Sequence, residues 1–387
     1  MIASLVHHKA EELRRLGDRK TDARFSFLKA LGIFFVVIGH VGPAVGLFAE
    51  DWFPQGPMKI PLFVFASGVF FASSADEKPF AFILRRAKRL LLPYFLWNIF
   101  YGVLCEILRL TGAIGFGMPL DATSIFLTPW VNGHQFGFNA AAWFLPALFL
   151  ASSLFALLRF LLKKLRILNE WALAAALFVL AWGAIRFSQE GYAHGAWLIL
   201  IRTVYFLPFL QLGKLLKTSL SDVKIPPVAF FAGVFLLAAA NRFFLGETSA
   251  VTVWCEFTGS PAGHLIGVTL AVLFWYKVAD LLSPALEKMP ALIFVGENTF
   301  SVMLHHALVI FLMNAVLLGL YKAGAVSVFD EAAFRSSIWY ADPLFGTKFY
   351  LCYVAAAILV PCLLRMGWNK GVLRLDQKLN PRPEADL

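Results

Sequence analysis

A lysine and a histidine, Lys29 and His40, stand eleven residues apart in the first long apolar segment of the chain. In a helix of about 100° per residue, eleven steps return to within roughly 20° of the starting face, so both side chains lie on one stripe, about 16 Å apart. An ionisable side chain is costly in hydrocarbon, and it usually faces the interior of a helix bundle and marks a functional path. The sequence therefore predicts that His40 lies deep in a membrane and that Lys29 lies near one surface.

The imidazole of His40 has four chemical interpretations: a hydrogen-bonded structural residue, a proton relay, a metal ligand or a general base. A metal site needs further ligands at matched depth, and the chain contains no HExxH or paired Cys/His pattern, so no metal is expected. A neutral imidazole titrates near working pH and tolerates apolar surroundings, which suits a general base. Lys29 alternatively serves as an anchor that reaches lipid head groups at the inner surface.

A basic cluster follows the second apolar segment, in an expected inner loop. Arg86 and Arg89 in this cluster are three residues apart and share a helix face. Guanidinium forks bind phosphates through two parallel hydrogen bonds. The cluster is therefore either an anchor at the cytoplasmic surface or a site for the phosphates of a nucleotide-bearing donor such as coenzyme A.

The elements that must position these residues are membrane-spanning helices. The chain is 59% hydrophobic and only 15% charged, with a mean hydropathy of +0.72, whereas soluble domains carry about 25% charged residues. Apolar runs long enough to span a bilayer predict an all-α polytopic membrane protein of about ten transmembrane helices. These runs, of which the second and fifth are short, are 25–48, 58–75, 90–110, 141–163, 170–187, 196–217, 226–245, 263–282, 290–316 and 349–367.

The distribution of basic residues predicts the orientation of the chain. With the N-terminus in the cytoplasm, 25 of the 34 Lys and Arg residues fall in the inner loops and tails, which is the positive-inside pattern. Both termini are therefore expected to be cytoplasmic, and the net charge of +10 does not indicate a nucleic acid partner. The expected parts are a cytoplasmic tail over 1–24 with a short helix, a transmembrane domain over 25–367, and a cytoplasmic tail over 368–387.

Two long segments, 111–140 and 318–348, are expected on the outer side, where long connections are usually functional or disordered. Trp130, His134 and Trp143 lie in or next to the first of them, and their rings could stack on a sugar at the outer mouth. Anchoring of the aromatic rings at the membrane interface is the alternative. Arg202 also lies near an outer helix end, where its side chain is expected to reach the interface.

The motifs, taken in order, resemble the integral-membrane acyltransferase family 3, whose members O-acylate bacterial surface glycans. The resemblance extends over about residues 20–367 and depends on their order, spacing and membrane sidedness. Lys29 stands where arginine is the commoner residue, which keeps the positive charge but loses the planar fork. The matching residues are Lys29 with His40, Pro61 to Phe63 with Ser67 and Gly68, Arg86 with Arg89, Trp143 to Leu145, and Gly296 to Ser301 with His305 and His306.

The resemblance implies transfer of an acyl group, usually acetyl, from cytoplasmic acyl-coenzyme A to a sugar hydroxyl of an extracytoplasmic glycan or lipid-linked sugar. It places the protein in the bacterial inner membrane, in contact with membrane lipid. His40 is then the base that deprotonates the acceptor hydroxyl or assists attack on the thioester. Lys29, Arg86 and Arg89 hold the donor phosphates or polarise the donor.

Three further residues are candidate substrate contacts, each with a simpler structural alternative. Glu297 either orients a partner or caps a helix as an acid in its first turn. His305 lies beside His306, and one of the two is expected to line a tunnel while the other makes a packing hydrogen bond. Ser67 precedes a glycine in a pattern more typical of close helix packing than of an oxyanion contact.

Two other classes of function fit the same composition. A transporter that flips a lipid-linked sugar or exports an anion would use the buried charges as a path and would not need coenzyme A. Such transporters often contain inverted repeats with broken helices, and no such pair is found in the sequence. A non-catalytic membrane scaffold is the third possibility, but it leaves the register of Lys29 with His40 unexplained.

Overall fold

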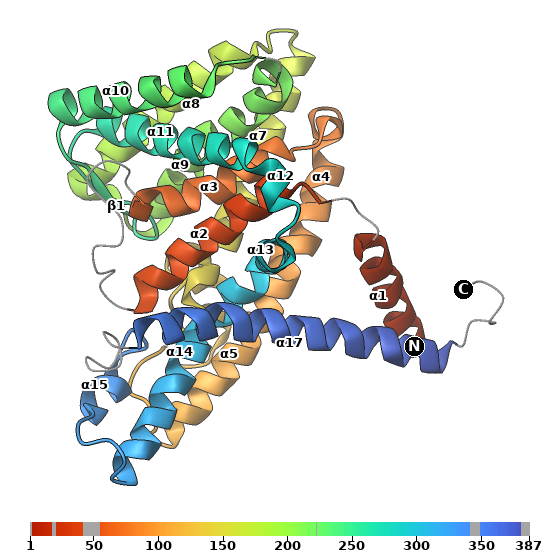
Figure 1. Ribbon diagram of the computed structural model, residues 1–387, viewed down its shortest axis with the longest axis vertical. Helices are drawn as coiled ribbons and strands as arrows, with labels where there is room; N and C mark the ends of the chain where they lie inside the picture. The colour runs from red at the N-terminus through yellow and green to blue at the C-terminus, as the bar shows by residue number, and fades with distance from the viewer. Residues whose placement is uncertain (1, 18–20, 42–54, 222, 341–348, 381–387) are drawn as a thin grey trace.

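The computed structural model describes residues 2–17, 21–41, 55–221, 223–340 and 349–380, which form a bundle of helices (Figure 1). Its longer helices are α1 (Ile2–Gly17), α2 (Ala23–Val41), α3 (Gln55–Val69), α4 (Pro79–Arg86), α5 (Leu92–Leu110), α7 (Phe144–Lys164), α8 (Glu170–Phe187), α9 (Gly195–Leu215), α10 (Pro227–Leu245), α11 (Pro261–Leu281), α13 (Pro290–Glu297), α14 (Thr299–Lys322) and α17 (Tyr350–Leu379). Its shorter elements are the helices α6 (Thr128–Val131), α12 (Ser283–Leu286) and α15 (Glu331–Ser336), the 3-10 turns η1 (Ser73–Asp76) and η4 (Ala140–Trp143), the π-helical turns η2 (Ala87–Leu91), η3 (Thr123–Leu127), η5 (Ser188–Tyr192) and η6 (Leu216–Leu220), and the strands β1 (Ser249–Val251) and β2 (Glu256–Thr258).

The membrane-spanning character predicted from hydropathy is confirmed. Among the described residues, nine helices are long and apolar enough to cross a membrane, and α3 supplies a shorter apolar helix over Pro57–Val69. These helices correspond one to one with the ten expected spans. The protein is therefore an all-α polytopic membrane protein, and one small β-hairpin is the only sheet among the described residues.

Several helix boundaries differ from those predicted. The third crossing runs without a break from Pro79 to Leu110, so the basic cluster lies within a helix and not in a loop. The fifth crossing, expected to be short, extends over Glu170–Tyr192. The expected span over 290–316 is interrupted at Asn298, between α13 and α14. Hydropathy marks where a chain is apolar, whereas a helix continues through polar residues until its backbone geometry changes.

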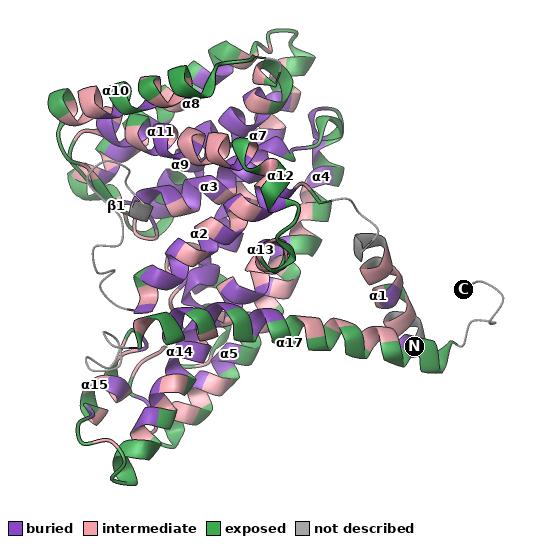
Figure 2. Ribbon diagram, viewed as in Figure 1, coloured by how far each residue is buried: buried purple, intermediate pink, exposed green. Residues whose placement is uncertain are grey.

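Helix α9 forms the centre of the upper half of the molecule. Its residues from Tyr205 to Leu215 are all buried, including the polar Gln211 and the charged Lys214. It packs against α3, α7 and α8. Helix α10 lies at the edge and is mostly exposed (Figure 2), so its apolar surface faces outward, where a bilayer would solvate it.

Glycines bring the backbones of α3 and α9 into direct contact. A Cβ atom at Gly68 would overlap the carbonyl oxygen of Leu210, and one at Gly213 would overlap that of Phe65. Small residues allow this close approach between membrane helices, where packing replaces the hydrophobic effect as the driving force. The same device joins α13 to α2, because a Cβ at Gly296 would overlap the Ser26 carbonyl.

The end of the bundle opposite the basic segments contains the hairpin. Strands β1 and β2 pair antiparallel, with Ser249 opposite Thr258, near the first turns of α3 (Figure 1). The hairpin is not predicted from the sequence. The long segment 111–140 folds back into the bundle at this end, since the rings of Phe136 and Phe138 are fully buried.

The two ends of the chain meet at the opposite side. Helix α1 packs against the far end of α17 (Figure 1), where Asp376 accepts hydrogen bonds from His7 at 2.9 Å and from Arg14 at 2.7 Å. The short N-terminal helix predicted from the sequence is present. Helix α1 and the C-terminal end of α17 therefore lie side by side.

Candidate functional site

A cavity of about 580 Å³ lies at the end of the bundle that contains the hairpin. His40 lines it from the last turn of α2, together with residues of α3, the η4 turn, the hairpin and the segment after α15. His40 is one residue from the end of α2 and is partly buried. The predicted depth of this ring in the membrane stays a prediction.

The ring of His40 contacts a second histidine. His40 Nδ1 lies 2.7 Å from His306 Nε2, and His306 Nδ1 lies 2.8 Å from the carbonyl oxygen of Val302. A carbonyl oxygen only accepts, so the Nδ1 atom of His306 carries its hydrogen and, in the neutral ring, its Nε2 atom accepts. The hydrogen shared between the rings therefore belongs to His40 Nδ1. This leaves His40 Nε2 with a free lone pair, which is the atom that a general base needs.

The outer wall of the cavity is aromatic. Trp143, Trp254 and Trp339 line it together with His134. The ring centroid of Trp339 lies 4.5 Å from that of His40, and that of Trp254 lies 5.1 Å from that of His134. Flat rings with a few polar groups between them are typical of small-molecule pockets.

The imidazole of His134 remains neutral at physiological pH. Burial, followed by the nearby positive charge of Arg202, lowers the pKa of His134 from its ordinary value of 6.5 to about 4. The ring therefore offers the pocket one donor and one acceptor and no charge. His134 lines the cavity, and its contact with a sugar stays a prediction.

Arg202 holds the hairpin over this wall. Its guanidinium donates to the carbonyl oxygen of Val253, from Nε at 2.8 Å and also from Nη2, and it lies 5.0 Å from the ring centroid of Trp143. Arg202 is only 2% exposed. The expectation that this side chain reaches the membrane interface is wrong, because the hairpin supplies a buried carbonyl acceptor that the sequence does not reveal.

The inner part of the cavity is apolar. It is lined by Ile33 and Val36 of α2, by Phe63 of α3 and by Met303 of α14. Ile33 lies seven residues before His40, which corresponds to about 10 Å of helix. The cavity thus extends from the aromatic outer wall past His40 into an apolar interior.

One cation inside this cavity was missed in the sequence. Lys59, in the first turns of α3, lines the pocket, and its Nζ atom would lie 3.0 Å from a Cβ atom at Gly39, next to His40. The signal that identified Lys29, a lysine in an apolar segment, was also present at this position. Lys59 places a positive charge where an anion could form or bind.

Lys29 lies outside this cavity and makes a different contact. Its Nζ atom is 2.6 Å from Glu297 Oε1, which also accepts a hydrogen bond from Ser26 Oγ at 2.8 Å. Glu297 is the last residue of α13 and not an acid in the first turn of a span, so the capping interpretation does not apply. Lys29 and His40 share one helix, as predicted, but the described cavity contains only His40.

Arg86 and Arg89 differ in exposure. The π-helical turn η2 begins at Ala87, and its wider i→i+5 bonding shifts the register of the residues that follow. Arg86 turns inward, where its Nε donates to Ser152 Oγ at 3.4 Å, while Arg89 is exposed. A phosphate bound by both guanidinium groups would have to contact the exposed Arg89 and the inward-facing Arg86 at the same time.

The remaining candidates lie outside the cavity. Trp130 donates its indole N–H to the Phe126 carbonyl at 2.9 Å, and Ser67 is partly buried on α3 beside the glycine contact. His305 is bonded to Tyr101 Oη at 2.6 Å, so its neighbour His306 is the histidine that reaches the site. The described residues contain no cluster of three or more His, Cys, Asp or Glu side chains that could hold a metal ion.

Comparison with known families assigns the chain to a class. A family model described as an acyltransferase domain, that of acyltransferase family 3, matches residues 22–366. The fold and this match together define a membrane acyltransferase. The chain belongs to acyltransferase family 3. Neither the curated proteins nor the solved structures contain a match to it.

Proposed function

We propose that this protein transfers an acetyl group from acetyl-coenzyme A to a hydroxyl group of a glycan or lipid-linked sugar on the far side of a bacterial inner membrane. The observation that carries the proposal is the unprotonated Nε2 atom of His40 in a cavity with an apolar inner part and an aromatic outer wall. The thioester would enter the apolar part, and the sugar would bind against the tryptophans.

The chemistry balances with this base. His40 Nε2 takes the proton of the acceptor hydroxyl while the hydroxyl oxygen forms a bond to the thioester carbonyl carbon. The C–S bond then breaks, and the protonated ring of His40 returns its proton to the leaving thiolate. The ammonium group of Lys59 is the charge on this cavity that would stabilise the oxyanion formed between these steps.

The donor phosphates would bind at the opposite end, which carries the basic residues. Arg89 is exposed there and Arg86 faces Ser152, so the two could contact different phosphates of one donor. Lys29 is paired with Glu297, and its role in this proposal is to hold α2 against α13. The positive-inside pattern supports a cytoplasmic location for this end.

The test of the base is the variant His40→Ala, assayed in membrane vesicles with radiolabelled acetyl-coenzyme A and by the O-acetyl content of the surface glycan. Loss of a general base should lower transfer by about 100-fold or more. The control His194→Ala changes an exposed histidine outside the cavity and should leave transfer unchanged. Transfer at the wild-type rate in folded His40→Ala protein would remove His40 from the mechanism.

Membership of an acyltransferase family favours the enzyme over the transporter considered from the sequence. The two functions also differ in a binding measurement. The purified enzyme should bind acetyl-coenzyme A and slowly release free thiol from it, whereas a flippase or anion exporter should do neither. An absence of both in folded protein would contradict the acetyl donor.

A further inference from the structure

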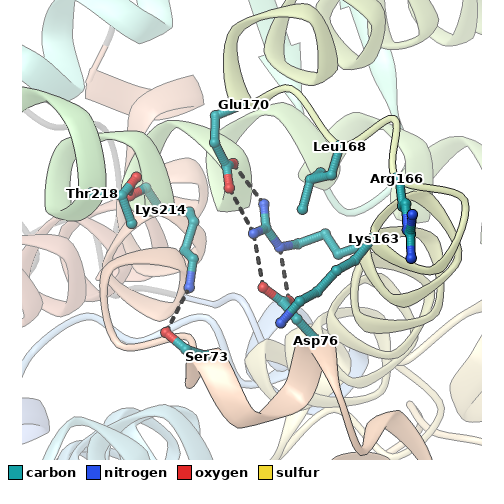
Figure 3. A pocket seen from close by; sticks show the side chains of 9 residues that line it. Ser73, Asp76, Lys163, Arg166, Leu168, Glu170, Lys214 and Thr218 are labelled. Carbon is teal, nitrogen blue, oxygen red and sulfur yellow. Dashed lines mark hydrogen bonds and ion pairs between the residues drawn. The ribbon is translucent and has the colours of Figure 1, made fainter.

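A second cavity, of about 400 Å³, lies at the basic end of the bundle, away from His40. It is formed by η1, the last turn of α7, the first turn of α8 and the end of α9 (Figure 3). Its volume falls within the range of about 300–1,000 Å³ typical of small-molecule sites. Four cationic side chains and two carboxylates line it.

One of the four cations, Arg159, is fully engaged with protein groups. Its Nε and Nη2 atoms donate to both oxygens of Asp76 at 2.9 Å, and Nη1 and Nη2 donate to Glu170 at 2.7 and 2.8 Å. Its fifth N–H reaches Gln211 Oε1 at 3.2 Å. Arg159 therefore forms ion pairs with both carboxylates of the cavity and links η1, α7, α8 and α9. Its N–H groups are not available to a ligand.

Lys214 is the buried cation that this network leaves without an ion pair. Its side chain points to Ser73 (Figure 3), and its nearest acceptors are Ser73 Oγ at 3.4 Å and the Phe71 carbonyl at 3.5 Å, both uncharged and distant. No carboxylate of the described residues lies within 4.0 Å of its ammonium group, and the residue is 3% exposed. The Phe71 ring lies 5.7 Å from the ammonium nitrogen, and Asp76 and Glu170 attract it only from beyond 4.0 Å. A buried ammonium with such weak partners would gain from an anion in direct contact with it.

Arg166 adds a cation at the rim, held there by an unusual backbone. Its φ angle is 60°, in the left-handed region that glycine or asparagine normally occupies after a helix. Its N–H bonds to the Lys163 carbonyl at 3.0 Å and thereby ends α7. Glycine would be free of strain at this position, and a strained residue at the edge of a cavity is a reason to look for function.

We propose that this cavity binds a phosphate group, as a phosphomonoester or a diphosphate, carried either by a soluble nucleotide-like molecule or by the headgroup of an anionic phospholipid. Lys214 supplies a charge-assisted hydrogen bond from the buried side, and Arg166 supplies a fork from the solvent side. The hydroxyl group of Ser73 is the neutral donor on the same walls, whereas that of Thr218 already donates to the Lys214 carbonyl at 3.0 Å. The site is separate from the proposed acetyl transfer and does not depend on it.

The test uses the purified full-length protein in nanodiscs of phosphatidylcholine, titrated with inorganic pyrophosphate at constant ionic strength while thermal unfolding is followed. Pyrophosphate should raise the midpoint of unfolding in a saturable manner. Lys214→Met should weaken binding about tenfold, as expected for the loss of one charge-assisted hydrogen bond. The control Lys217→Met changes an exposed lysine outside the cavity and should bind as the wild type does.

Arg166→Gly is a second variant, and it should fold at least as well as the wild type. It should raise the unfolding midpoint of the free protein, because strain is removed, and it should weaken pyrophosphate binding about tenfold. Nanodiscs with phosphatidylglycerol identify the source of the phosphate: competition with pyrophosphate indicates the lipid headgroup, and its absence indicates a soluble ligand. Saturable binding that is unchanged in both variants, or no saturable binding at all, would overturn the site whether or not the protein transfers acetyl groups.

Discussion

His306 fixes the tautomer of His40. The Nε2 atom of His306 accepts the Nδ1 hydrogen of His40 at 2.7 Å because the opposite nitrogen of His306 is committed to the Val302 carbonyl at 2.8 Å. A backbone carbonyl on α14 thus determines, through two rings, which nitrogen of His40 is free to take a proton. Such orienting groups commonly matter almost as much as the reactive group itself.

Replacement of His306 should therefore reduce turnover without abolishing donor binding. His306→Ala is expected to lower kcat by about 10- to 100-fold and to leave the KM for acetyl-coenzyme A near the wild-type value. His306→Gln should recover part of the loss, because its amide oxygen can accept the same hydrogen. Steady-state kinetics on protein of unchanged unfolding midpoint provide the measurement, and a wild-type kcat in His306→Ala would contradict the positioning role.

The low pKa of His134 makes one part of the stability of the protein depend on pH. The unfolded chain binds a proton below about pH 6.5, whereas the folded chain does so only near pH 4. The free energy of unfolding should therefore fall as the pH is lowered through this window, by at most about 3 kcal/mol from this one group.

Comparison of wild type with His134→Gln isolates that contribution. Unfolding midpoints measured from pH 7.5 to pH 4 should fall less steeply in the variant, and the exposed control His194→Gln should follow the wild-type curve. Parallel curves for wild type and His134→Gln would show that His134 is equally accessible to protons in both states.

Exchanging the charges of Lys29 and Glu297 tests two roles of Lys29 against each other. One is the ion pair with Glu297, and the other is the binding of the donor, as expected from the sequence. If the ion pair between α2 and α13 is what Lys29 provides, the single variants Lys29→Glu and Glu297→Lys should both lose stability, by up to about 1 kcal/mol for a partly exposed pair. The double variant should recover it together with activity. A donor KM that stays high in the double variant would instead place Lys29 at the phosphates.

Removal of Arg159 should be far more damaging than removal of a surface cation. Arg159→Ala leaves Asp76 and Glu170 without the guanidinium that pairs both of them, a loss of about 3–5 kcal/mol for a buried charge network. The nearby exposed pair of Lys163 with Glu77 is the control, and Lys163→Ala should change stability by less than about 1 kcal/mol. Equal unfolding midpoints for the two variants would contradict the role of Arg159 in holding these elements together.

The glycine contact between α3 and α9 predicts that two glycine-to-alanine substitutions differ in their effect on the stability of the protein. Gly68→Ala places a methyl group on the Leu210 carbonyl and should destabilise the protein by about 1–3 kcal/mol. Gly183→Ala, in α8, meets nothing within 4 Å and should be neutral or slightly stabilising. Thermal unfolding in one detergent compares the two, and equal effects would show that α3 can move away from α9.

The number of crossings and the fold class could be predicted because a bilayer demands long apolar helices, which hydropathy reads directly. The interruption at Asn298 and the π-helical turn at Ala87 could not be predicted, since hydropathy does not report where a helix backbone changes its hydrogen bonding. The hairpin is too short to give a period-2 pattern, and with it the burial of Arg202 was missed.

The site was predictable in part. The spacing from Lys29 selected His40, and the position in or next to the long outer segment selected His134 and Trp143; all three line the cavity. His305 and His306 are adjacent on a helix, so they point about 100° apart, and only the tertiary contact decides that His306 meets His40. Trp254 and Trp339 come from segments far along the chain, and no local pattern connects them to α2.

The backbone contact between α3 and α9 has a mechanical consequence. Helix α3 places Lys59 on the cavity of His40 and leads to Ser73 at the second cavity, while α9 extends from Arg202, which contacts the hairpin, to Lys214 at the second cavity. The close backbone contacts at Gly68 and Gly213 leave no room for the two helices to slide past each other. Helices α3 and α9 therefore form one rigid unit that connects the two cavities. Any opening that admits a substrate must therefore arise from the elements around these two helices, such as the joint between α13 and α14.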